Sequence, residues 1–179
     1  MNILQPPMIL LLSLSVIQFI ILTQFNWRCA EKADSSRKYV GFRMNKGRFG
    51  AQLFHLISGY GIARTLNRTH YLSLQDGYIA HVVKFLRQFK DVFPRLQDTF
   101  VLAPYDAPET HVDFIGGCCN FLNPLRLYNN TAEYMFLKFK FGQHPKYFQD
   151  YLADIRQILK FSSVVEQTGE KSFRTVWKS

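Results

Sequence analysis

The sequence predicts an α/β fold built on a parallel sheet, and two observations support that class. Short β-prone segments alternate with longer segments whose apolar residues recur every three or four positions. This alternation is typical of units in which a helix returns the chain to the same end of the sheet. With 179 residues, of which 47% are hydrophobic, the chain can form one domain with a sizeable core.

The expected elements can be placed in chain order. Strands are expected at 39–42, 69–74, 99–102, 111–115 and 134–141, and helices at 52–67, at 80–93 and from Pro145 onward. Pro94 ends the second helix because proline lacks a backbone donor, whereas Pro145 suits the first turn of the third. The stretches 103–109 and 116–130 contain residues that favour turns and are expected to be irregular.

The N-terminal segment is strongly apolar, and residues 1–27 carry no charged side chain. As a helix, residues 8–25 would rise roughly 27 Å, close to the hydrocarbon thickness of a bilayer. We therefore expect a short tail at 1–7, a transmembrane signal anchor at 8–27, a polar stem at 28–38 and the domain at 39–179. A cleaved signal peptide is the alternative, and either reading sends the rest of the chain across the membrane.

Two features of the sequence disagree about the side of the membrane on which the domain lies. Basic residues follow the expected span and none precedes it, which favours a cytoplasmic domain. Two Asn-x-Thr sequons, at Asn67 and Asn129, are candidate N-glycosylation sites and favour a lumenal domain.

The three cysteines leave the disulfide state open. Cys29 could bond to Cys118, to Cys119 or to another molecule, whereas the adjacent pair could bridge to itself only with strain. Free thiols are the alternative. No spacing of cysteine and histidine resembles a zinc site, and no metal ion is expected.

The segment Lys46-Gly-Arg-Phe-Gly-Ala-Gln52 joins the first expected strand to the first expected helix. A strand, a glycine turn and a helix start together present backbone N–H groups to an anion such as a phosphate. Arg48 adds a forked cation suited to a diphosphate. A tight turn with Arg48 in solvent is the alternative.

The same segment, followed by Gly59-Tyr-Gly-Ile-Ala-Arg-Thr-Leu-Asn-Arg-Thr69, resembles the N-terminal motif of fucosyltransferases that use GDP-fucose. The resemblance is strongest to the α-1,2-fucosyltransferase family (glycosyltransferase family 11) in its nematode form. This family usually has Asn where the chain has Ala51. A second match to the family lies further along, at Gln143, Lys146, Tyr147, Phe148 and Phe161. The two matches together cover residues 39 to about 162.

The resemblance implies the Rossmann-like N-terminal half of a GT-B-type glycosyltransferase. It implies metal-independent transfer of fucose from GDP-fucose to a galactoside, by a type II Golgi membrane protein with a lumenal body; a secreted protein or one of the endoplasmic reticulum lumen is the alternative. The family binds the nucleotide through a His-x-Arg motif, but none of the five histidines here has arginine two positions later. We therefore expect an incomplete or inactive enzyme. No general base is identified. The implied substrate-binding residues are Gly47, Arg48, Phe49, Gly50 and Gln52.

Two alternatives to an enzyme remain open at this point. The chain could be a non-catalytic, membrane-anchored relic that binds or regulates a full-length relative in a homo- or hetero-oligomer. It could be a basic module for anionic glycans, because its net charge of +9 lies wholly after residue 27. The lumenal signals argue against nucleic acid as a partner. His55 is either a site residue or a buried histidine of the first helix.

Overall fold

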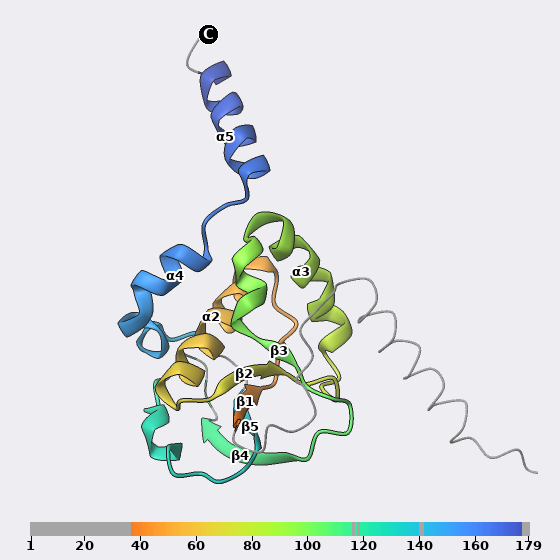
Figure 1. The fold of residues 1–179 in the computed structure, drawn as a ribbon, viewed down its shortest axis with the longest axis vertical. Helices are drawn as coiled ribbons and strands as arrows, with labels where there is room; N and C mark the ends of the chain where they lie inside the picture. Colours follow the sequence, from red (N-terminus) through yellow and green to blue (C-terminus); the bar gives the residue numbers. More distant parts are fainter. Residues whose placement is uncertain (1–36, 116, 118, 140–141, 177–179) are drawn as a thin grey trace, which may run out of the picture.

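A computed structural model describes residues 37–115, 117, 119–139 and 142–176, with the backbone alone for 172–176. Within these residues five parallel strands form one sheet in the order β3-β2-β1-β5-β4 (Figure 1). This arrangement confirms the predicted α/β class and fits a Rossmann-like fold. The strands are β1 (Tyr39–Phe42), β2 (Thr69–Leu72), β3 (Val101–Leu102), β4 (Glu109–Ile115) and β5 (Tyr134–Phe139).

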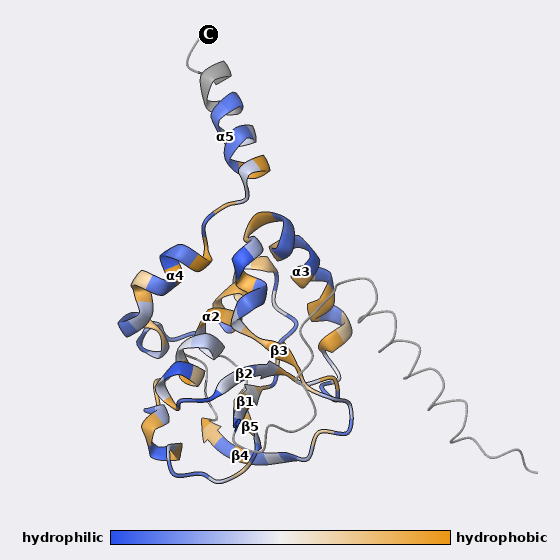
Figure 2. Cartoon of the chain, viewed as in Figure 1, coloured by the Kyte–Doolittle hydropathy of each residue, from blue (hydrophilic) through white to orange (hydrophobic). Residues whose placement is uncertain are grey.

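The helices of the described part connect the strands and continue beyond the last one. The α-helices are α2 (Phe49–Thr65), α3 (Ile79–Val92), α4 (Leu152–Ile158) and α5 (Ser163–Val176). Short 3-10 helices lie at η1 (Pro94–Thr99), η2 (Pro124–Leu127), η3 (Pro145–Tyr147) and η4 (Gln149–Tyr151). Figure 1 shows α5 projecting away from the rest of the molecule, and Figure 2 shows that most of its described residues are hydrophilic.

The connections between neighbouring strands all move along the sheet in one direction. α2 links β1 to β2, α3 links β2 to β3, and the segment with η2 links β4 to β5. Because parallel crossovers are right-handed, connections that step in the same direction lie on the same face. Leu56 and Ile62 of α2 are fully buried against that face. The opposite face is covered in part by residues 103–108, whose Ala103 and Ala107 pack with Tyr71.

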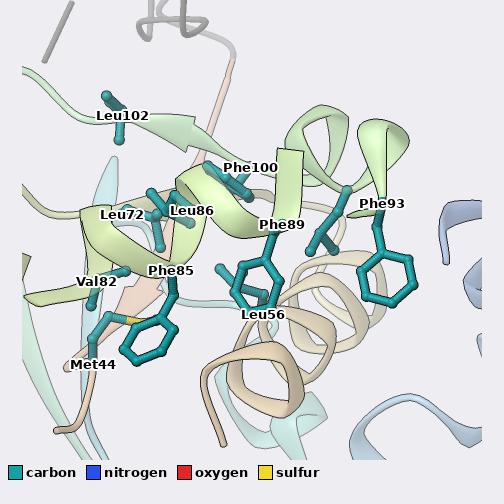
Figure 3. Close-up of a cluster of buried hydrophobic side chains, with 11 residues drawn as sticks. Met44, Leu56, Leu72, Val82, Phe85, Leu86, Phe89, Phe93, Phe100 and Leu102 are labelled. Atoms are coloured by element: carbon teal, nitrogen blue, oxygen red, sulfur yellow. The ribbon is translucent and has the colours of Figure 1, made fainter. Parts of the chain in front are cut away.

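The core between α2 and α3 is rich in aromatic side chains. Phe85 and Phe89 lie one turn apart on α3, and Phe93 follows at the end of that helix. Figure 3 shows Phe89 close to Leu56 of α2. Phe49, at the start of α2, also reaches this cluster, with its ring centroid 4.5 Å from that of Phe89. Burial of these rings removes a large apolar area from water and fixes α3 on α2.

Two helices differ from the prediction. α2 begins at Phe49, three residues early, because the backbone carbonyl of Arg48 already accepts the N–H of Gln52. The continuous helix expected from Pro145 is wrong, since Phe148 has a φ of −138° and α4 begins only after it. Tertiary packing explains the break, because the Phe148 ring centroid lies 5.2 Å from that of Phe54 on α2. A separate α5 was not expected.

Some predicted features fall outside the described residues. These are the tail at 1–7, the anchor at 8–27, most of the stem at 28–38, and two cysteines, Cys29 and Cys118. Among the helices that the structure does describe, none is both long and apolar enough to cross a membrane. Cys119 is disulfide-bonded and is therefore not a free thiol.

Gly61 permits the close approach of α2 to η3. A Cβ built there would lie 2.0 Å from the backbone oxygen of Tyr147, which a change of rotamer cannot relieve. We expect Gly61→Ala to lower the free energy of unfolding in urea by about 1–2 kcal/mol, since overpacking outweighs the gain in helix propensity of about 1 kcal/mol. Gly50→Ala in the same helix is the control, because its Cβ would meet nothing within 4 Å. Equal effects in both variants would contradict the close-packing explanation.

Candidate anion-binding site

Three loops meet at the carboxyl-terminal edge of the sheet. They follow β1 (43–48), β2 (73–78) and β5 (from 142 in the described part), and β1 lies between the other two strands. Ligands of parallel α/β proteins usually bind at this edge, where loops and helix N-termini converge. The predicted substrate-binding segment occupies the central loop and the first turn of α2.

Asn45 organises the loop after β1. Its side-chain oxygen accepts the N–H of Gly47 at 2.7 Å, and its side-chain nitrogen lies 2.9 Å from Nε2 of His55. The Gln52 side chain donates to the backbone oxygen of Asn45 at 2.6 Å and to that of Gly47 at 3.1 Å. Side chains of α2 therefore hold the turn from which α2 itself starts.

His55 joins this loop to the loop after β5. Its Nε2 also accepts the backbone N–H of Gly142 at 3.2 Å. Because a backbone N–H can only donate, Nε2 carries no proton and the neutral ring is protonated at Nδ1. Burial lowers the pKa of His55 to about 4. Burial, together with the nearby His55, lowers the pKa of His70 to about 3.

The loop after β2 holds the same turn from the other side. The Asp76 carboxylate accepts the N–H of Met44 at 2.9 Å and that of Tyr78 at 3.1 Å. His81, near the start of α3, has its Nε2 3.2 Å from the carbonyl oxygen of Gly47. The backbone of the turn is thus fixed by neighbouring loops on both sides.

The five predicted substrate-binding residues divide into two groups. Gly47 and Gln52 hold the turn, and the ring of Phe49 packs against the core. Arg48 and Gly50 are exposed at the start of α2. The structure therefore presents one forked cation and one backbone position without a side chain to solvent.

The N-terminus of α2 has no side-chain cap in the part of the chain that the structure describes, and its first turn holds no acidic residue. The first N–H groups of an α-helix have no partner inside the helix, so those of Phe49, Gly50 and Ala51 are available to an anion. A Cβ at Gly50 would meet nothing within 4 Å, so the space beside it is open. Arg48 stands next to these donors and can add charge-assisted hydrogen bonds.

Several residues that shape the site lie outside the predicted motif. Asn45, Asp76, His81 and Gly142 were missed, although asparagine two positions before glycine is a turn signal that could have identified the first. His55 is fully buried and bonds two loops, which fits its interpretation as a buried histidine. No group of three side chains suited to a metal ion occurs among the residues described.

Comparison with characterised and named proteins finds nematode glycosyltransferases. The chain is 27% identical over 164 residues to the Caenorhabditis elegans "Putative galactoside 2-alpha-L-fucosyltransferase svh-11", which covers 83% of this chain and 44% of that protein. It is 30% identical over 141 residues to the C. elegans "Putative glycosyltransferase C06E1.7", a match that covers 73% of this chain and 38% of that protein. A C. elegans "Galactoside 2-alpha-L-fucosyltransferase" is 28% identical over 131 residues, a match that covers 72% of this chain and 32% of that protein. The chain belongs to the fucosyltransferase family.

This fucosyltransferase-family chain spans less than half the length of each of these relatives. No protein-family model matches the sequence, and no solved structure matches it. The family resemblance that the motifs indicated is thus confirmed by similarity over 72–83% of the chain.

The two buried histidines make the stability of the fold depend on pH. In the unfolded chain each titrates near 6.5, whereas in the fold they stay neutral down to about 4 and about 3. The unfolded state binds more protons below 6.5, so their contribution is complete above that pH and is lost as the pH falls toward about 4 for His55 and about 3 for His70. From neutral pH to pH 5 we expect a loss of about 2 kcal/mol per histidine in the free energy of unfolding in urea.

The variant His55→Gln tests this origin. We expect a smaller loss of stability between neutral pH and pH 5 in this variant, because one of the two buried titrating groups is gone. Leu56→Ala, which weakens the packing of the same helix without removing a titrating group, is the control and should keep the wild-type pH dependence. The same pH dependence in His55→Gln and wild type would rule out His55 as a source.

Proposed function

We propose that this chain takes part in transfer of fucose from GDP-fucose to a galactoside hydroxyl, forming an α-1,2 linkage. In this proposal it supplies the N-terminal half of a GT-B-type fold. Two relatives named galactoside 2-alpha-L-fucosyltransferase support the choice of reaction. The observation that carries the proposal is the uncapped start of α2 with Arg48 exposed beside it.

The exposed start of α2, made by Arg48, Phe49, Gly50 and Ala51, is called the anion-binding corner below. The diphosphate of the donor is the group that suits it. It carries negative charge and several acceptor oxygens, while the helix start offers N–H donors and the positive end of the helix dipole. Arg48 can bind two oxygens at once through its guanidinium fork. Arg43 and Lys46 are exposed in the same loop and add positive charge that attracts an anion. We place the diphosphate on Arg48 and on the N–H groups of Phe49 and Gly50.

The proposed reaction breaks one bond and forms one. The acceptor hydroxyl oxygen bonds to the anomeric carbon of fucose with inversion, the bond from that carbon to the β-phosphate oxygen breaks, and GDP leaves. The hydroxyl proton passes to a general base, which we do not assign. Arg48 and the α2 amides stabilise the charge that gathers on the departing diphosphate, so the proposal requires no metal ion.

A second function, binding without turnover, is favoured by the structural roles of three residues of the motif. Gly47, Phe49 and Gln52 serve the turn and the core. Ala51 stands where the family usually has Asn, so one polar side chain is missing from the corner. A membrane-anchored relic could keep the diphosphate contact through Arg48 and bind either the donor or a full-length relative.

We also propose a lumenal location in the Golgi, behind a type II anchor at residues 8–27. The two sequons support it, and so does the disulfide-bonded Cys119, because disulfides persist in oxidising compartments. Secretion, or residence in the endoplasmic reticulum lumen, would satisfy the same observations.

Binding of GDP tests the diphosphate assignment. Arg48→Ala removes charge-assisted hydrogen bonds, and we expect roughly 10- to 100-fold weaker GDP binding in titration calorimetry, since such bonds contribute about 1.5–3 kcal/mol. Guanosine, which lacks phosphate, should bind the variant and the wild type equally. Arg156→Ala on α4 is the control, because it removes an exposed arginine outside the corner. Unchanged GDP affinity in Arg48→Ala would show that the diphosphate lies elsewhere.

A transfer assay separates the two functions. If the chain is catalytic, radiolabelled fucose moves from GDP-fucose to a galactoside, EDTA has no effect, and Arg48→Ala lowers kcat/KM about tenfold. If it only binds, GDP affinity depends on Arg48 while neither transfer nor GDP-fucose hydrolysis is detected. Transfer that is lost in EDTA would contradict the metal-free reaction.

A further inference from the structure

Both sequons lie at the amino-terminal edge of the sheet, away from the candidate site. Asn67 lies just before β2, and Asn129 lies in the loop before β5. The first residues of β1, β2 and β5 pair with one another at this edge. The anion-binding corner follows the other end of β1. A glycan on either asparagine would therefore leave the corner open.

Arg68 joins the two sequons. It is the middle residue of Asn67-Arg68-Thr69, and its buried guanidinium donates to the backbone oxygens of Tyr39 at 3.1 Å, of Ala132 at 2.7 Å and of Asn130. Asn130 is the middle residue of the second sequon. Burying a guanidinium is costly unless its donors are paired, so these hydrogen bonds tie the first sequon into the fold.

Folding also fixes the backbone of the first sequon. Asn67 has a φ of 51°, the left-handed conformation that ends α2, and the N–H of Arg68 bonds to the oxygen of Ala63 at 2.8 Å. Thr69 begins β2, where its N–H bonds to the oxygen of Lys38 at 2.9 Å. The three residues cannot become extended together without opening the end of α2 and the start of β2.

The second sequon remains accessible in the folded chain. Asn129 and Thr131 are exposed in the loop before β5, and their side chains make no hydrogen bond with any other described residue. Asn130 between them is held at its backbone oxygen, which accepts from Arg68 and from Lys38, and its side-chain oxygen accepts the N–H of Ala132 at 2.9 Å. The side chains of Asn129 and Thr131 can therefore be reached by another protein's active site without opening a helix or a strand.

We propose that Asn129 is the main N-glycan acceptor of the folded chain, and that Asn67 is modified only before folding is complete. The sequon requirement for Thr two positions after Asn means that the modifying enzyme reads both residues. The Asn129 sequon offers both in the folded state. The Asn67 sequon can no longer enter the active site of the modifying enzyme once Arg68 is buried and Thr69 joins the sheet. This inference rests on the proposed lumenal location.

The modification is a transfer from a lipid diphosphate oligosaccharide by the cell's oligosaccharide transferase. The Asn129 side-chain nitrogen bonds to the anomeric carbon of the first sugar, and the bond from that carbon to the diphosphate oxygen breaks. The lipid diphosphate leaves, and one amide proton is lost. No oxidant or reductant is required.

The test expresses the full chain in cells with a secretory pathway and measures glycan occupancy of each sequon by mass spectrometry of its peptides. Wild type should carry a glycan on Asn129 in nearly all molecules and on Asn67 in a minority. Two variants weaken the fold and keep both sequons: Arg68→Ala, and Leu137→Ala in the buried centre of β5. Both should raise Asn67 occupancy several-fold and leave Asn129 unchanged.

Four results would overturn the inference. Equal occupancy of Asn67 and Asn129 in wild type would show that folding does not protect the first sequon. A rise in Arg68→Ala without one in Leu137→Ala would assign the effect to the local sequence. A chain that resists protease in sealed vesicles yet lacks a glycan on Asn129 would also refute it, while leaving fucosyl transfer untouched. Digestion in sealed vesicles would instead refute the lumenal location, and this inference with it.

Discussion

A neutral imidazole within α2 holds the carboxyl-terminal edge of the sheet together. The Nε2 atom of His55 faces Asn45 on one loop and the N–H of Gly142 on another. A proton on that nitrogen would set donor against donor, so the shape of the edge requires the uncharged ring. Asn45 in turn shapes the turn from which α2 starts. The exposed helix end is therefore preorganised, and an anion would not have to order the loop as it binds.

This polar edge has a cost that the packing around it must offset. Oε1 of Gln52 and Nδ1 of His55 are buried without a hydrogen-bond partner in the described chain, at about 1–3 kcal/mol each. Glycines let α2 approach its neighbours closely: a Cβ at Gly59 would lie 2.3 Å from the His70 ring. Close packing of α2 on the sheet keeps water from the histidines, which is also why their charged forms are disfavoured.

The sequence predicted what local patterns determine and missed what distant contacts determine. Alternation and periodicity placed the strand at 39–42 without error and the next two helices within three residues. The break at Phe148 was invisible because its cause is the ring of Phe54, far away in sequence. The motif predicted where the corner lies, yet it could not show that Gln52 serves the turn whereas Arg48 faces solvent. That division depends on Asn45, which pattern reasoning had no reason to connect to His55.

Parallel topology explains why the two ends of this sheet have different chemistry. Each crossover helix starts near the carboxyl edge and ends near the amino edge, so positive helix ends gather at one side and helix C-termini at the other. The start of α2 lies at the first edge with Arg48, and its last residues run directly into the Asn67 sequon at the second. One helix thus separates the proposed anion-binding corner from the surface that we propose carries glycans. Bulky modification at one end of α2 is compatible with ligand binding at the other because the length of the helix stands between them.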